Sequence, residues 1–260
     1  MSKKFGLTSL LVPVLILGWV FVVNSVFASD LIDLIKWDFP NNPDDAVADS
    51  GITTNLSQTI QSQGTNSITF SSSGATTNST RATGWDSGVD SKYWVIEFNS
   101  VGYQSLQLSS KQRGSATGPK DFKIQYKIGV EASWTDVSGG NIIVADNWTS
   151  GVVNNLSLPA EADNQASVFI RWIMTNNGRV DSLGDVSSAG ASNIDDIAIT
   201  GVVVPSASTL TSIAITAPAT KLSYIVGDTL DIAGLVVEGA YSDASTSTLS
   251  VTATDITGFD

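Results

Sequence analysis

Residues 121–129 read DFKIQYKIG, and this stretch decides the fold class. Its apolar side chains occupy every second position, at Phe122, Ile124, Tyr126 and Ile128, while polar or charged side chains occupy the positions between them. A period of two is that of a β-strand with one buried face and one face in water. The stretch therefore predicts a half-buried strand of an antiparallel sheet.

Four further stretches, 93–98, 103–110, 167–174 and 193–201, have the composition of strands. Gly, Asn, Ser and Pro are concentrated between them, as in NNPDD, SVGY, SGGN and TNNGR, which favours tight turns. Short strands separated by such turns are typical of an antiparallel β-sandwich. In residues 93–98 we expect Trp94, Ile96 and Phe98 to face the core, and in residues 103–110 we expect Leu106 and Leu108 to do so. In residues 167–174 the expected inward side chains are Val168, Ile170, Trp172 and Met174.

The composition limits both the chemistry and the partners. The chain of 260 residues contains neither His nor Cys, which removes the Ser–His–Asp triad, the Cys–His pair, disulfides and the usual zinc sites. Its 13 basic and 25 acidic residues give a formal net charge of −12. Because nucleic-acid binding depends on Lys and Arg, this charge argues against a nucleic-acid partner.

The first 28 residues have the features of a signal peptide. Lys3 and Lys4 precede an apolar run from Gly6 to Val23, and Val26 and Ala28 occupy the small-residue positions before an expected cleavage site. The alternative is an uncleaved membrane anchor, since the run has roughly the length that spans a bilayer. Either way we expect an extracellular or cell-surface protein, with membrane contact only through an uncleaved leader.

The segment from residue 30 to 201 resembles the jelly-roll domains of exported bacterial modular surface proteins. The resemblance rests on a Trp-x-Phe first strand, a Gly-Trp turn, a Gly-Pro strand and an Ile-Asp-Asp last strand: WDF at 37–39, RATGWDSG at 81–88, GPKDFKIQY at 118–126 and NIDDIAITG at 193–201. It implies a jelly-roll β-sandwich but no particular activity, because sandwiches carry many functions.

Residues 202–208 form an expected linker, and residues 209–260 resemble bacterial Ig-like domains of the group 3/4 type. The residues that carry this second resemblance are Leu210 and Ile213, then YIVGD at 224–228, GLVV at 234–237, YSD at 241–243 and GFD at 258–260. In that family a further pair of strands follows the last motif. We therefore expect an incomplete Ig-like sandwich, with part of its apolar face uncovered.

Two kinds of binding site are predicted in the first domain. Asn42, Asp44, Asp45 and Asp49 cluster after the first strand, and Asp195 and Asp196 lie on a late strand that meets the first strand in jelly rolls. Carboxylate oxygens suit calcium, so this set predicts a possible structural calcium site, although a solvated turn is the alternative. No other cofactor is expected.

The second predicted site is a surface for sugars. Trp85, Trp134 and Trp148 fall nearest to loops, whereas Trp37, Trp94 and Trp172 occupy inward positions of strands. Exposed aromatic faces stack against sugar rings, so the three loop tryptophans predict a site for an extracellular glycan. The alternative is burial, which is the more frequent fate of a tryptophan.

No catalytic constellation can be assembled from the remaining residues, so we expect a protein that is not an enzyme. The favoured interpretation is a non-catalytic region of a secreted or cell-surface modular protein, in which the first domain binds a ligand and the Ig-like domain is a spacer. An alternative is the accessory N-terminal region of an exported hydrolase or nuclease whose catalytic module lies beyond residue 260. A third is a purely structural stalk or adhesin segment.

Overall fold

The computed structural model describes residues 30–41, 44–71 and 73–259. The chain divides into two compact units at the junction between Val204 and Pro205. This junction lies within the expected linker 202–208, whose first two residues belong to the last strand of the first unit. The predicted leader, residues 1–28, lies outside the described residues. Within the described part, no helix is both long enough and apolar enough to cross a membrane.

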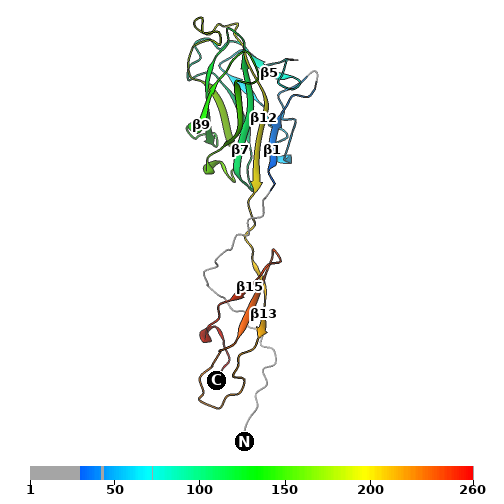
Figure 1. Ribbon diagram of the computed structural model, residues 1–260, viewed down its shortest axis with the longest axis vertical. Helices are drawn as coiled ribbons and strands as arrows, with labels where there is room; N and C mark the ends of the chain where they lie inside the picture. The colour runs from blue at the N-terminus through cyan, green and yellow to red at the C-terminus, as the bar shows by residue number, and fades with distance from the viewer. Residues whose placement is uncertain (1–29, 42–43, 72, 260) are drawn as a thin grey trace. The chain divides into compact units, whose positions relative to one another are not determined.

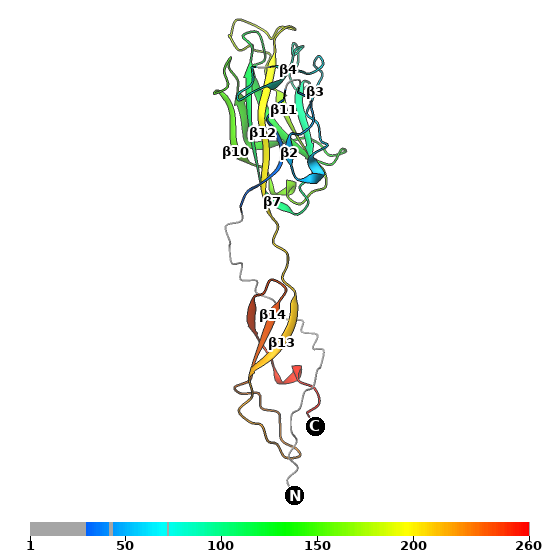
Figure 2. The same cartoon turned by 90° about the vertical axis from the view of Figure 1, so that its right-hand side faces the viewer.

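The first unit consists of two antiparallel sheets (Figures 1 and 2). One sheet has the strand order β10-β7-β12-β1-β2, and β5 and β4 extend it from β12. Its strands are β1 (Ile32–Trp37), β2 (Ser50–Gly51), β4 (Thr69–Ser71), β5 (Ser79–Ala82), β7 (Tyr103–Gly114), β10 (Gly151–Ser157) and β12 (Ser192–Val203). Figure 1 shows β7, β12 and β1 side by side, as their pairing requires.

The other sheet has the order β3-β6-β11-β8-β9. Its strands are β3 (Gln61–Gln63), β6 (Tyr93–Phe98), β8 (Asp121–Ile128), β9 (Thr135–Ile143) and β11 (Val168–Met174). Two short 3-10 helices, Thr53–Asn55 and Ala160–Ala162, lie in the connections. The predicted all-β, jelly-roll β-sandwich is confirmed for this unit.

The hydrophobic core lies between the two sheets, and the predicted inward faces point into it. Trp94, Ile96 and Phe98 of β6 are fully buried, and so are the alternate residues of β11. Trp37 and Trp172 are also fully buried, as their positions in the sequence predict. The period-two pattern therefore identified correctly which side of each strand is covered.

Polar side chains in the same interior satisfy the buried indoles. The Nε1 atom of Trp94 donates to Oγ of Ser192 at 3.1 Å, and Nε1 of Trp172 donates to Oγ of Ser110 at 3.2 Å. Ser192 also accepts a hydrogen bond from Nε2 of Gln112 at 3.0 Å. Because buried donors cost free energy when they lack an acceptor, these serines hold the large rings in fixed positions.

Strand β12 changes its partner along its length. Residues 192–194 pair with β5, and residues 197–201 pair with β1, with a shift in register between Asp195 and Ala198 on the β7 side. Asp196 has φ 46°, in the left-handed region that aspartate tolerates better than most residues. The irregularity is a β-bulge, and at this bulge Oδ2 of Asp195 accepts a hydrogen bond from the N–H of Ala75, in the loop between β4 and β5.

The second unit contains one three-stranded antiparallel sheet of order β13-β14-β15. Its strands are β13 (Leu210–Ala217), β14 (Val236–Tyr241) and β15 (Thr246–Leu249), followed by the 3-10 helix Ala253–Asp255. Two of the motifs behind the Ig-like resemblance meet here, because the rings of Tyr224 and Phe259 pack edge-to-face at 4.6 Å. Ile225 is exposed, whereas Val237 on the central strand is buried. Membership of the Ig-like family remains a prediction.

Candidate functional site

Trp85, one of the three tryptophans predicted to bind sugar, is a core residue. Its exposed fraction is 0%, and its ring packs 5.7 Å from Trp94 and 5.6 Å from Phe122. Its Nε1 atom donates to the carbonyl oxygen of Ala82 at 3.0 Å. The turn after β5 directs this side chain inward rather than to solvent. The prediction for Trp85 is therefore wrong, and the large apolar area of the ring explains its burial.

Trp148 lies in the turn that follows β9 and is half-buried. Its Nε1 atom donates to the carbonyl oxygen of Ser73, in the loop between β4 and β5, at 3.2 Å. Within the described part of the chain, no other aromatic ring packs against it. Trp148 therefore joins two loops and is an isolated ring rather than part of an aromatic surface.

Trp134 lies at the other end of β9, and its ring contacts side chains on the outer face of the five-stranded sheet. The ring of Tyr93, from β6, is 6.1 Å away and inclined at 60°. The guanidinium carbon of Arg171, from β11, lies 4.3 Å from the Trp134 centroid, and Nζ of Lys127, from β8, lies 5.2 Å from it. Three neighbouring strands thus contribute to one group around Trp134.

The two cations also contact further aromatic rings. Arg171 lies 4.8 Å from the ring of Tyr93, and Nζ of Lys127 lies 4.7 Å from the ring of Phe169 on β11. Each such contact contributes about 0.5–1 kcal/mol at an exposed site. We call Tyr93, Trp134 and Phe169, with Lys127 and Arg171, the aromatic platform. All five side chains are half-buried, so the platform is fixed by its own packing and still reaches solvent.

The register of the sheet explains why these side chains meet. Phe169 is paired with Lys127, and Arg171 is paired with Gln125, across β11 and β8. Gln125 is in turn paired with Asp136 on β9. Residues directly opposite one another in antiparallel strands point to the same face. Every second residue of these strands points into the core, so the residues between them lie together on the outer face of the sheet.

A hydrogen-bonded chain of polar groups borders the platform. Nε of Arg171 donates to Oε1 of Gln125 at 2.7 Å, and Nε2 of Gln125 donates to Oδ1 of Asp136. Nζ of Lys123 lies 3.1 Å from the same carboxylate. The hydrogen bonds from Gln125 and Lys123 hold the pKa of Asp136 below its ordinary value, whereas burial lowers the pKa of Arg171.

This arrangement presents what sugar recognition requires. Aromatic rings offer apolar faces to the C–H groups of a pyranose, and planar amide, carboxylate and guanidinium groups exchange hydrogen bonds with hydroxyls. Among the predicted residues, only Trp134 belongs to the platform. Tyr93, Phe169, Arg171 and Lys127 were missed, as was the bordering Gln125, although the outer positions of the alternating strands were the signal that could have found them.

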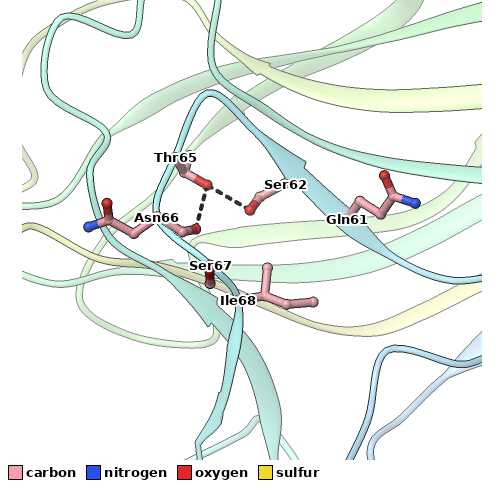
Figure 3. Close-up of a pocket in the computed structure, with 6 residues that line it drawn as sticks. All are labelled: Gln61, Ser62, Thr65, Asn66, Ser67 and Ile68. Atoms are coloured by element: carbon pink, nitrogen blue, oxygen red, sulfur yellow. Dashed lines mark hydrogen bonds between the residues drawn. The ribbon is translucent and has the colours of Figure 1, made fainter.

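A shallow pocket lies at the turn between β3 and β4 (Figure 3). Oγ1 of Thr65 lies 2.6 Å from Oγ of Ser62 and 3.0 Å from the carbonyl oxygen of Asn66, and these hydrogen-bond contacts close the turn on itself. The pocket is lined by Gln61, Ser62, Thr65, Asn66, Ser67 and Ile68. Because this lining contains no aromatic ring, the platform is the stronger candidate for a sugar site.

The carboxylates predicted to bind calcium are occupied by backbone donors. Oδ2 of Asp49 accepts from the N–H groups of Asp38 at 2.8 Å and Phe39 at 2.9 Å, and burial raises the pKa of Asp49 above its ordinary value. Oδ2 of Asp44 accepts from the N–H of Asn41 at 3.0 Å, and Oδ1 of Asp45 accepts from Val47. These contacts organise the loop after β1.

Asp195 and Asp196 likewise accept hydrogen bonds from the loop between β4 and β5. Oδ2 of Asp195 accepts from the N–H of Ala75 at 2.7 Å, and its Oδ1 accepts from the N–H of Asp196 at 2.7 Å. Asp196 forms an ion pair of 2.8 Å with Lys111. Among the described residues, no three acidic side chains converge in a way that could hold a metal ion. The described residues therefore do not assemble the predicted calcium site, and Asn42 lies outside them.

Comparisons with known proteins define no family for this chain. No family model and no curated protein matches it. Among solved structures, the CBM22-1 xylan-binding domain of Paenibacillus barcinonensis Xyn10C is 15% identical, with a TM-score of 0.42, over 68% of this chain and 97% of that domain. The family 11 carbohydrate-binding module of cellulase Lic26A-Cel5E from Clostridium thermocellum is 14% identical, with a TM-score of 0.33. The match covers 69% of this chain and 99% of that module.

A further similar structure is the K2 cleaved adhesin domain of Lys-gingipain, at 12% identity and a TM-score of 0.34, over 63% of this chain and 96% of that domain. With identities of 12–15% and TM-scores below 0.5, these similarities do not identify the ligand of this protein.

Proposed function

We propose that the first unit is a non-catalytic carbohydrate-binding domain and that the aromatic platform is its binding surface. The observation that carries this proposal is the meeting of Tyr93, Trp134 and Phe169 on one outer sheet face, beside the polar chain from Arg171 to Asp136. Aromatic rings on the outside of a sheet add nothing to the core between the sheets. Their clustering with fixed hydrogen-bonding groups suits a ligand that is apolar on its ring faces and polar at its edges.

The position of the platform on a sheet suits a binding role. Its side chains come from β6, β8 and β11, three consecutive strands of one sheet, with Trp134 joining from the segment before β9. A surface built on paired strands keeps its geometry better than one built on loops. Binding to such a surface therefore requires little ordering of the protein.

We further propose that the protein acts outside the cell, where its leader would direct it, and that residues 209–260 form an Ig-like spacer. The motif pair Tyr224 and Phe259 and the strand pairing of residues 210–249 support this assignment. The absence of His and Cys from the sequence favours a binding role over catalysis, since it removes the commonest nucleophile–base pairs.

A glycan array probed with the full chain tests the proposed function. The unchanged protein should bind a subset of glycans, and Trp134→Ala should lose that binding while remaining folded, with a melting temperature lowered by a few degrees because three ring contacts are lost. Trp148→Ala is the matched control, because it removes a half-buried tryptophan that lies outside the platform. The proposal fails if the unchanged protein binds no glycan, or if Trp134→Ala binds as well as the unchanged protein.

A further inference from the structure

The cations of the aromatic platform differ from most others because, among the described residues, neither forms an ion pair with a carboxylate. Within the described residues, ion pairs to carboxylates hold seven basic side chains: Lys36, Lys92, Lys111, Arg113, Lys123, Arg179 and Lys221. Lys127 and Arg171 appear in none of these pairs. Two positive charges thus share the ring of Trp134 in a protein with a net charge of −12.

The hydrogen bonds of these two cations leave their charges uncompensated. Nζ of Lys127 donates to the carbonyl oxygen of Val130 at 2.6 Å, and Nε of Arg171 donates to the neutral amide of Gln125. Tyr93 also acts on Arg171 through a side-chain hydrogen bond, and its phenol is neutral near pH 7. Asp90 and Asp136 act on Arg171 through electrostatic attraction, and Asp136 is already bonded to Gln125 and Lys123. A positive site therefore persists at the centre of the platform.

We propose that the ligand of the aromatic platform is an acidic saccharide, whose carboxylate interacts with Lys127 and Arg171 while its sugar ring packs against the aromatic side chains. This inference rests on the proposed function, since it specifies which class of sugar the same surface takes. Hydrogen bonds between a carboxylate and ammonium or guanidinium groups are roughly twice as strong as neutral ones. The acidic remainder of the protein repels anions, so a preference for an acidic sugar must arise locally.

The test compares acidic oligosaccharides with their own methyl esters, which keep the ring and remove the charge. Oligomers of galacturonate, alginate and hyaluronan are titrated calorimetrically into the full chain, each beside its esterified form. At least one acid form should bind about 10-fold or more tightly than its ester, because hydrogen bonds to charged groups are stronger than hydrogen bonds to neutral ones. The difference should shrink as the salt concentration rises, since salt screens exposed charges.

Variants at Lys127 locate the effect. Lys127→Met keeps the aliphatic stem and should reduce the preference for the acid form about 5-fold or more, while Lys127→Arg should retain it. Lys120→Met is the matched control, because Lys120 lies before β8, its Nζ donates to Oγ of Ser182, and the substitution causes the same change in net charge. Lys120→Met should leave the preference unchanged.

The outcomes separate this inference from the proposed function. If neutral glycans or esters bind at the platform as tightly as every acid form, the inference is overturned and the sugar-binding function stands. If Lys127→Met and Lys120→Met lower the preference equally, the acid is attracted by general charge and the inference is again overturned. If no glycan of either kind binds, the proposed function itself is wrong.

Discussion

Oε1 of Gln125 accepts a hydrogen bond from Nε of Arg171 at 2.7 Å, and the amide nitrogen of the same side chain donates to Asp136. Gln125 thus links β11 to β9 across β8 and fixes the guanidinium beside Trp134. It is a buried glutamine on the outer face of a sheet, with an exposed fraction of 8%. Its amide positions the platform and is shielded from most contact with solvent.

Replacing Gln125 by alanine should loosen the platform. The variant removes one acceptor from Arg171 and one donor from Asp136, and an unpaired buried partner costs about 1–3 kcal/mol. We expect sugar affinity to fall about 10-fold, measured by calorimetry, and the melting temperature to drop by a few degrees. Gln107→Ala, on β7 of the opposite sheet, should leave affinity unchanged. Equal affinities for Gln125→Ala and the unchanged protein would show that Gln125 does not position the site.

Trp85 and Trp134 should respond in opposite ways to truncation. Trp85→Ala removes a fully buried ring and should lower the free energy of unfolding by about 3–5 kcal/mol in urea titrations. Trp134→Ala removes a half-exposed ring and should cost much less, while abolishing sugar binding. A stable Trp85→Ala protein would contradict the assignment of Trp85 to the core.

Ser192 should matter for stability although it is small and polar. Its hydroxyl accepts from Trp94 and Gln112, so Ser192→Ala leaves two buried donors without an acceptor. We expect a loss of about 1–3 kcal/mol for each donor in the free energy of unfolding. Ser138→Ala, at an exposed position of β9, is the control and should change stability by less than about 0.5 kcal/mol. A loss no larger than that of the control would contradict this role of Ser192.

Asp195 should make the stability of the first unit depend on pH. Burial raises the pKa of this carboxyl from 3.8 to about 6 in the folded protein, so ionisation disfavours the fold. The stabilising contribution of protonated Asp195 to the free energy of unfolding is therefore fully present below pH 3.8. It is lost as the pH rises through about 6. A shift of this size corresponds to about 3 kcal/mol.

Unfolding of Asp195→Asn measures this contribution. Asparagine cannot ionise, so the variant should lack the part of the decline between pH 4 and 6.5 that Asp195 causes in the unchanged protein. It also loses one acceptor for the N–H groups of Ala75 and Asp196, which lowers its stability at every pH. Parallel pH profiles for the two proteins would show that Asp195 does not titrate in this range.

The fold was predictable because burial imposes a period of two on every well-covered strand. In β8, Phe122 and Ile124 lie in the core, and Tyr126 and Ile128 pack against it half-buried. In β11, Val168, Ile170, Trp172 and Met174 are buried. The partner change of β12 was not predictable, since it depends on a bulge at Asp195 and Asp196 that has no local signature. The same bulge explains why those carboxylates serve loop 74–76 rather than a metal ion.

The site was predictable only in part. Proximity to loops suggested Trp85, Trp134 and Trp148 as binding residues. The three turns have similar compositions, yet Trp85 is fully buried, whereas Trp134 and Trp148 are half-buried. Phe169 and Arg171 lie on a strand whose apolar sequence predicts burial in the core. Whether their side chains meet Trp134 depends on the register of β8, β9 and β11. Register is a property of paired strands, so a single sequence does not reveal which outer residues meet.

Chemical-shift mapping with a sugar that binds tests the central claim most directly. The six tryptophans that follow the predicted leader give six indole N–H signals, and the signal of Trp134 should move on titration together with backbone amides of β6, β8 and β11. The buried indoles of Trp37, Trp85, Trp94 and Trp172 should remain nearly unchanged. Shifts confined to Trp148, or to the sheet of β7, β10 and β12, would contradict a binding surface at the aromatic platform.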